Sequence, residues 1–415
     1  MTARGDGTAA ITRATLQDVE DYTIPSEIDG VTITDIGESA FYNCECLVTL
    51  TIPDTVTSIA DSAISWCLNL KEVNLPDSVT SIGDHAFHSC THLESINIPD
   101  SVTSIGSGVF TCCYQLADIR ISPDHPVFTF SNNALIDKRE RVFKQHIGQG
   151  TGTYVIPRRI EKIGAQAFDF INIITVEIPE GVTSIEDCAF SGMRYLKRIS
   201  IPDSVASIGY KAFYGDINLE AVRIPAGVTE IGGGSFAWCD KLSIEVDPAN
   251  PVFEMRDNML INKAEHKLCF HQNRDNGTLE VPEGIEIIDN CAFENSRNLT
   301  EIILPDTVKE IGQDAFACCL SLTSLRLPVG LKTIPQSMLR DSNSLRSITI
   351  PEGTEMIESL AFWKCENLEE AILPASLIRI GINAFADCSG LVCKVTEGST
   401  AQYLCEENNI PYTIR

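Results

Sequence analysis

Long apolar runs are missing from this chain. No segment reaches the roughly 18 consecutive apolar residues that a membrane-spanning helix needs, so we expect no membrane insertion. The first ten residues, MTARGDGTAA, also lack the hydrophobic stretch of a signal peptide. Two interpretations stay open: a cytosolic protein, or a protein whose leader has been removed.

Positive charge is scarce. The chain has 31 Lys and Arg residues against 57 Asp and Glu residues, which gives a formal net charge of −26. Proteins that bind nucleic acids or anionic membranes neutralise phosphates with basic side chains. We therefore expect no nucleic-acid partner. The acidic groups form either a solvated surface or an attraction for a basic partner.

Catalytic and cofactor-binding motifs are absent as well. The sequence contains no G-x-S-x-G, H-E-x-x-H, Walker or dinucleotide-binding loop. Its acidic pairs fall on outward positions of a repeat, where no pocket would enclose them. We therefore predict a protein that is not an enzyme and that has no cofactor and no metal.

What the chain does contain is one repeated unit, clearest in PDSVTSIGDHAFHSCTHLESINI at residues 76–98. Leu93, Ile96 and Ile98 follow the pattern L-x-x-I-x-I, which predicts a strand with one buried face. Pro99 has no N–H group and ends the strand.

The rest of the unit runs from this proline back to the next strand. Val102 and Ile105 are predicted to point inward, and Gly106 to permit a backbone bend. Residues 84–90, DHAFHSC, have the composition of one or two helical turns with Phe87 on the buried side. A unit of this length buries too little apolar surface to fold alone. Successive units must therefore stack into a solenoid.

The repeat is interrupted twice, at residues 122–156 and 247–281. The two insertions match at an offset of 125 residues, so that Pro126 corresponds to Pro251 and His146 to His271. Each has extended runs around a polar turn, at 137–141 and 262–266. We predict two β-hairpins that project from the same edge of the solenoid.

Both ends of the chain depart from the repeat. Alternating residues at 10–12 and 22–24 predict a hairpin within residues 6–35 that covers the first coil. In the segment 396–415, Ser399 is a candidate helix N-cap, followed by a helix at 401–407 and a strand at 410–414. This segment is predicted to be a C-terminal cap.

The 16 cysteines are unevenly placed. Eight occur three residues after the Phe, or its substitute, of an A-F motif, where other copies carry Met, Ile, Asp or Ser. We predict reduced thiols that act as small packing groups rather than disulfides. The eight are Cys44, Cys67, Cys90, Cys113, Cys239, Cys319, Cys365 and Cys388.

The full pattern, L-x-x-I-x-I-P-x-x-V-T-x-I-G-x-x-A-F-x-x-C, is seen at residues 93–113 and 299–319. It resembles the 23-residue class of leucine-rich repeat found in BspA-like proteins. The resemblance implies an α/β solenoid with a parallel β-sheet on the concave face and short helices on the convex face. It also implies a secreted or cell-surface bacterial protein that adheres to host or neighbouring-cell proteins, such as extracellular-matrix proteins.

We therefore expect residues 1–415 to form a single leucine-rich repeat solenoid. Its predicted parts are an N-terminal capping hairpin (6–35), repeats (36–121), a hairpin insertion (122–156), repeats (157–246), a second hairpin insertion (247–281), repeats (282–395) and a C-terminal cap (396–415).

The concave strand face is the default binding surface of such a solenoid. Its outward columns carry mixed polar side chains and no row of aromatic residues, which suits a protein partner or a merely solvated surface. The function we favour is a non-catalytic protein-binding or adhesion module, and the alternative is a spacer or scaffold domain of a larger surface protein. The candidate binding residues are Asn74, Asn97, Arg120, Glu177, Arg198, Arg223, Glu301 and Arg326.

Three other motifs point to sharper functions. His85, His88 and His92 surround Cys90 at spacings that suggest zinc, but they occupy variable positions of the repeat and we prefer a structural interpretation. Arg4-Gly5-Asp6 spells an integrin-type tripeptide, which also occurs by chance. Glycan binding would need an aromatic pocket, for which the candidates are Phe128, Phe130 and Phe253 in the insertions.

Overall fold

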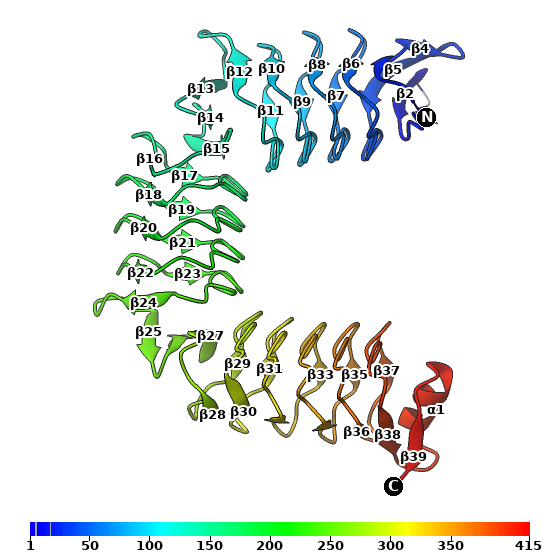
Figure 1. Cartoon of the computed structure of the whole chain (residues 1–415), viewed down its shortest axis with the longest axis vertical. Coiled ribbons are helices and arrows are strands. Elements are labelled where there is room, and N and C mark those ends of the chain that lie inside the picture. Colours follow the sequence, from blue (N-terminus) through cyan, green and yellow to red (C-terminus); the bar gives the residue numbers. More distant parts are fainter. Residues whose placement is uncertain (5, 17) are drawn as a thin grey trace. The chain divides into compact units, whose positions relative to one another are not determined.

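The computed structural model describes residues 1–4, 6–16 and 18–415. The chain divides into two compact units, Met1–Phe213 and Tyr214–Arg415. Each unit is a stack of coils built from parallel β-strands (Figure 1). That residues 1–415 form one continuous solenoid stays a prediction.

Each regular coil of the first unit contributes one longer strand and one two-residue strand. The longer strands are β3 (Asp21–Thr23), β6 (Thr49–Thr51), β8 (Glu72–Asn74), β10 (Ser95–Ile98), β12 (Asp118–Ile121), β16 (Thr153–Val155), β18 (Thr175–Glu177) and β20 (Arg198–Ser200). The short strands are β7 (Ser58–Ile59), β9 (Ser81–Ile82), β11 (Ser104–Ile105), β17 (Lys162–Ile163), β19 (Ser184–Ile185) and β21 (Ser207–Ile208).

The second unit follows the same plan. Its longer strands are β22 (Ala221–Ile224), β24 (Ser243–Val246), β28 (Gly277–Glu280), β30 (Leu299–Ile303), β32 (Ser324–Arg326), β34 (Ser347–Thr349), β36 (Glu370–Ile372) and β38 (Val392–Val395). Its short strands are β23 (Glu230–Ile231), β29 (Ile287–Ile288), β31 (Glu310–Ile311), β33 (Thr333–Ile334), β35 (Met356–Ile357) and β37 (Arg379–Ile380).

The strand predicted from L-x-x-I-x-I is confirmed. In β10 the side chains of Ile96 and Ile98 are buried, whereas Asn97 between them is exposed. β10 pairs in parallel with β12, so that Ser95 lies opposite Asp118, one repeat later. Repeated apolar positions therefore stack directly above one another, and they form one core cluster within residues 9–147 and another within residues 259–405.

The helices predicted for the outer side of each coil are wrong. Residues 84–92, which with their equivalents we call the turn arc, are a succession of turns, with positive φ at His85 and Ser89. The N–H groups of His85, Phe87 and Ser89 donate to carbonyl oxygens of the next coil. An α-helix would direct these N–H groups along its own axis, so bonding between coils takes the place of the helix.

The aromatic residue of each A-F motif lies inside the turn arc. Phe87 and Phe110 stack with ring centroids 5.8 Å apart, and Phe362 and Phe385 with centroids 4.9 Å apart. Parallel stacking follows from the identical register of neighbouring coils. The phenylalanines thus form a ladder through the core.

The glycine that follows β11, Gly106, is required because the backbone of the preceding coil approaches it closely, which the sequence did not reveal. The φ of Gly106 lies outside the left-handed region, so a positive φ is not what requires a glycine here. A Cβ atom at this position would lie 2.5 Å from the backbone nitrogen of Asp84 in the preceding coil. The position therefore admits only a residue without a side chain, because the neighbouring backbone approaches so closely.

The cysteine slot has a second role beyond packing. The thiol of Cys90 donates to the carbonyl oxygen of Ile64 at 3.2 Å, and Cys319 does the same to Phe293 at 3.3 Å. In the coil where serine replaces cysteine, the hydroxyl of Ser342 donates to the equivalent oxygen at 2.9 Å. In the coils with Cys or Ser the slot thus holds a small hydrogen-bond donor, whereas other coils fill it with Met or Ile, and all 16 cysteines are free thiols.

The two insertions are antiparallel but do not project from the stack. They comprise β13 (Phe128–Ser131), β14 (Ala134–Asp137) and β15 (Val142–His146), and β25 (Phe253–Arg256), β26 (Met259–Asn262) and β27 (Lys267–His271). The last strand of each then joins the short-strand sheet, since β15 pairs in parallel with β17 and β27 with β29. Phe143 also stacks on Phe168 at 4.8 Å, so the insertion extends the core.

The N-terminal segment is not the predicted hairpin. β2 (Thr8–Ile11) pairs in parallel with β5 (Val31–Ile36), while β3 pairs in parallel with β6. The two predicted strands therefore belong to different sheets. Antiparallel pairs are instead formed by β1 (Thr2–Ala3) with β2 and by β4 (Glu27–Ile28) with β5.

The C-terminal helix and strand are confirmed. Helix α1 spans Thr400–Glu407, and the Ser399 hydroxyl accepts a hydrogen bond from the backbone N–H of Gln402, as an N-cap does. It is the only α-helix in the described part of the chain. After it, β39 (Tyr412–Ile414) pairs in parallel with β38.

Candidate binding faces

All eight candidate residues lie on the longer strands, with side chains turned away from the core. We call the outward side of these strands the strand face. Seven of the eight are exposed and Glu301 is half-buried. They are Asn74 on β8, Asn97 on β10, Arg120 on β12, Glu177 on β18, Arg198 on β20, Arg223 on β22, Glu301 on β30 and Arg326 on β32.

Asn97 and Arg120 are brought directly together. They are partners in the register of β10 and β12. The guanidinium group of Arg120 donates from Nη2 to the hydroxyl oxygen of Ser95 at 2.7 Å and from Nε to Asp118 at 3.1 Å. These bonds hold the arginine across two strands, while its side chain stays 64% exposed.

Further along the first unit, Glu177 and Arg198 lie on adjacent strands but are not register partners. Thr175 is opposite Arg198, and Glu177 is opposite Ser200. The two charged residues are therefore diagonal neighbours, a separation that long side chains can bridge. This places a second pair of charged candidates on the same type of surface.

In the second unit the candidates form local contacts of the same kind. Glu301 accepts a hydrogen bond from the hydroxyl of Thr278 at 3.1 Å. Arg326, a diagonal neighbour of Glu301, donates to Asp306 at 3.0 Å. Arg223 pairs with Asp247. Exposed ion pairs of this type contribute about 0–1 kcal/mol to stability, so these arginines are free to exchange partners at little cost.

Sequence reasoning missed a group of exposed aromatic side chains on the turn arcs. In the first unit they include Tyr42, Trp66 and Tyr114, of which Tyr114 is 50% exposed, and also Tyr195. Trp66 lies beside His88 of the next coil, with ring centroids 6.0 Å apart. Tyr and Trp are enriched at protein interfaces. Their signal in the sequence was an aromatic residue at a variable position, one to five residues after the A-F phenylalanine or the residue that replaces it.

The histidine cluster is organised by coil packing. The buried thiol of Cys90 donates to the carbonyl oxygen of Ile64. The ring of His92 forms a 2.7 Å hydrogen bond to the carbonyl oxygen of Leu68, and the rings of His85 and His88 meet edge to face. In residues 1–4, 6–16 and 18–415 no group of three or more His, Cys, Asp and Glu residues is arranged to hold a metal ion.

Two of the three aromatic residues proposed for glycan stacking are buried and unavailable. Phe128 and Phe253 are buried in the core, and Phe130 is half-buried. The insertions turn these rings inward because their last strands join the sheet, so the predicted aromatic pocket is wrong. The Arg4-Gly5-Asp6 motif includes a residue outside the part of the chain that the structure describes.

The described residues were compared with the requirements for a membrane-spanning helix. Across the described residues, no helix combines the length and the apolar character needed to cross a bilayer.

Comparison with known proteins identifies relatives at the level of repeat and fold. The profile of the BspA type Leucine rich repeat region matches residues 18–138, 152–264 and 266–392. A leucine rich cell surface protein from Faecalibacterium prausnitzii, whose crystal structure is known, shares 30% identity. The match covers 97% of this chain and 94% of that one, with a TM-score of 0.53.

A more distant solved structure is a leucine-rich repeat protein from Eubacterium ventriosum. It is 22% identical over 87% of this chain and 91% of that one, with a TM-score of 0.46. No match was found among curated proteins. The profile covers most of the chain, and the coils show the register that its repeat requires. The chain therefore belongs to the BspA-type leucine-rich repeat family.

Proposed function

We propose that this protein is a non-catalytic adhesion module of a bacterial cell surface or of a secreted protein, and that it binds host or neighbouring-cell proteins through the strand face. The observation that carries the proposal is the near full-length similarity to a leucine rich cell surface protein. A repeated, mixed polar surface on rigid strands suits recognition of another protein, because the scaffold fixes side-chain positions before binding.

Arginine has a particular place on this surface. The chain is strongly acidic, yet four of the eight candidate residues are arginines: Arg120, Arg198, Arg223 and Arg326. A guanidinium group offers several donors in a planar fork, and arginine is enriched at binding hot spots. The bonds of Arg120 to Ser95 and Asp118 hold its fork in place at the surface, which reduces the entropy lost on binding.

The test is a binding screen of the full chain against extracellular-matrix and cell-surface proteins by surface plasmon resonance. For a partner found in this way, R120A is expected to weaken binding at least about tenfold, as loss of a hot spot does. The matched control is R141A, because Arg141 is also exposed and pairs with an acidic residue, Glu161, but lies in the turn between β14 and β15.

Two results would count against the proposal. One is a screen that returns no partner at micromolar concentration, which favours a spacer or scaffold role. The other is a partner whose binding R120A and R141A weaken equally, which places the contact away from the strand face.

A further inference from the structure

The last repeat coil of the second unit, residues 380–391, leaves a row of backbone donors without partners. In the preceding coil the N–H groups of Leu360, Phe362 and Lys364 donate to the carbonyl oxygens of Ile382, Ala384 and Ala386, at 3.1, 2.8 and 2.9 Å. One coil later the equivalent N–H groups belong to Asn383, Phe385 and Asp387. No acceptor for these three lies within the described residues.

Two backbone carbonyl groups of the same edge already have donors within their own coil. The carbonyl oxygen of Asn383 accepts from the N–H of Ala386 at 3.1 Å, and that of Phe385 from Cys388 at 3.3 Å. At Asn383 and Phe385 the backbone therefore offers donors and no unused acceptors. A symmetric pairing of this edge with that of a second copy would set donors against donors, so the occupant must bring acceptors.

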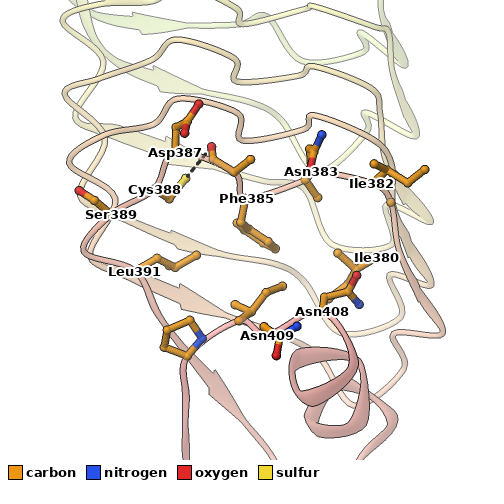
Figure 2. A pocket seen from close by; sticks show the side chains of 15 residues that line it. Ile380, Ile382, Asn383, Phe385, Asp387, Cys388, Ser389, Leu391, Asn408 and Asn409 are labelled. Atoms are coloured by element: carbon orange, nitrogen blue, oxygen red, sulfur yellow. Dashed lines mark hydrogen bonds between the residues drawn. The ribbon is translucent and has the colours of Figure 1, made fainter.

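A cavity of about 650 Å³ lies over this edge, between the turn arc of the last coil and the residues that follow α1. Figure 2 shows the ring of Phe385 directed into this space, toward Asn409. One face of that ring stacks on Phe362, and on the cavity side the phenylalanine ladder stops. Ile382, which also lines the cavity, is 77% exposed. The cavity thus has apolar surface as well as backbone donors.

The lining of the cavity carries negative charge and no positive charge. Asp387 is the one charged residue in its lining, and the lining contains no Lys or Arg. The Asp387 carboxylate accepts a hydrogen bond from Nε1 of Trp363 at 3.0 Å. A free anion is disfavoured beside this carboxylate, whereas neutral carbonyl groups and a basic side chain are favoured.

The coils inside the molecule show what such an edge binds. There a row of alternate N–H groups receives a backbone whose carbonyl groups are spaced two residues apart, and in many coils, as at Phe362 and Phe385, its aromatic ring continues the ladder. We propose that the last coil binds an extended polypeptide segment of a partner protein, with an aromatic residue over Phe385 and a basic residue two positions later, over Asp387. Alternate carbonyl oxygens of the segment accept from Asn383, Phe385 and Asp387.

The probe is a fluorescein-labelled peptide that copies residues 358–366 of this chain, with the change C365S. It carries an aromatic residue at Phe362 and a basic residue at Lys364, in the required spacing. Fluorescence anisotropy measures its binding to the full chain. A control peptide with F362A and K364E is expected to bind at least about tenfold more weakly, since it loses the ring contact and reverses the charge.

Ile382 of this coil and Ile378, just before it, give a matched pair of protein variants. Ile382 lines the cavity, whereas Ile378 is 61% exposed but lies outside the lining. I382A is expected to weaken peptide binding about tenfold, and I378A to leave it unchanged. D387N is expected to weaken binding several-fold, with a smaller dependence on salt than the unaltered protein shows.

Hydrogen exchange locates the bound backbone. The amides of Asn383, Phe385 and Asp387 are expected to exchange rapidly in the free protein and to slow on peptide binding, while those of Leu360 and Phe362 are slow throughout. Absence of peptide binding, equal effects of I382A and I378A, or protection only elsewhere would overturn the proposal. A dimer of the full chain that I382A dissociates would assign the edge to a second copy and would also overturn it.

Discussion

Replacement of Cys319 tests whether the repeated cysteine is a hydrogen-bond donor or only a packing group. Its thiol is fully buried and donates to the carbonyl oxygen of Phe293 at 3.3 Å. In the next coil Ser342 makes the equivalent bond at 2.9 Å. C319S therefore keeps the donor and C319A removes it, whereas a pure packing role would make the more apolar alanine at least as well tolerated.

The expected magnitudes follow from these contacts. C319A loses the transfer free energy of one buried heavy atom, about 1 kcal/mol, and a thiol hydrogen bond worth up to about 1 kcal/mol. The local free energy of unfolding should thus fall by about 1–2 kcal/mol. C319S loses apolar volume but retains the bond, so we expect a loss below about 1 kcal/mol.

Hydrogen–deuterium exchange with mass spectrometry suits a repeat protein, because its coils need not unfold together. Peptides covering residues 290–345 should exchange about 5 to 30 times faster in C319A, and at most about fivefold faster in C319S. C46A and C46S provide the control, since Cys46 is exposed and should show no difference. If C319S were as destabilised as C319A, or more so, the hydrogen-bond explanation would be refuted.

Three further predictions concern glycine, thiol and histidine positions. G106A should destabilise the first unit by about 1–3 kcal/mol, because the added Cβ overlaps the Asp84 backbone; G390A, whose Cβ would meet nothing within 4 Å, should be nearly neutral in the same urea titration. Iodoacetamide should modify Cys46 in the folded protein but Cys90 only in denaturant, because burial raises the pKa of the Cys90 thiol to about 12; labelling of native Cys90 would contradict this. Burial lowers the pKa of His146 from 6.5 to about 4, so the unfolded chain binds a proton that the folded chain does not, and stability should fall by up to about 3 kcal/mol between pH 7 and pH 4. H146F should lack that contribution, measured as the difference between the two pH profiles; identical profiles would show that His146 does not contribute.

Much of the fold is readable from the sequence because the repeat imposes a single register. The alternation of Ile96, Asn97 and Ile98 fixes which side of the strand is buried, and this does not depend on the sequence of the neighbouring coil. The regular spacing then requires that successive units stack, which predicts the strand face. Ser399 caps the helix through a hydrogen bond to a residue three positions later. The helix could therefore be predicted without tertiary information.

Other features depended on neighbours distant in the sequence. The turn arcs look helical by composition, but their N–H groups bond to the next coil, and this contact decides between helix and turn. The insertions look like free hairpins, yet β15 and β27 find partners in the short-strand sheet. The donor edge at Asn383, Phe385 and Asp387 exists only because no coil follows the last one within the described structure, a fact that no single repeat contains.

The sequence by itself determined the repeat, the inward and outward sides of its strands and the family, since each depends on a pattern within about 23 residues. Tertiary structure alone decided the course of the turn arcs, the seating of the insertions and the location of unpaired donors. The physical reason is that backbone hydrogen bonds between coils compete with those within a coil, and their outcome depends on what lies one coil away.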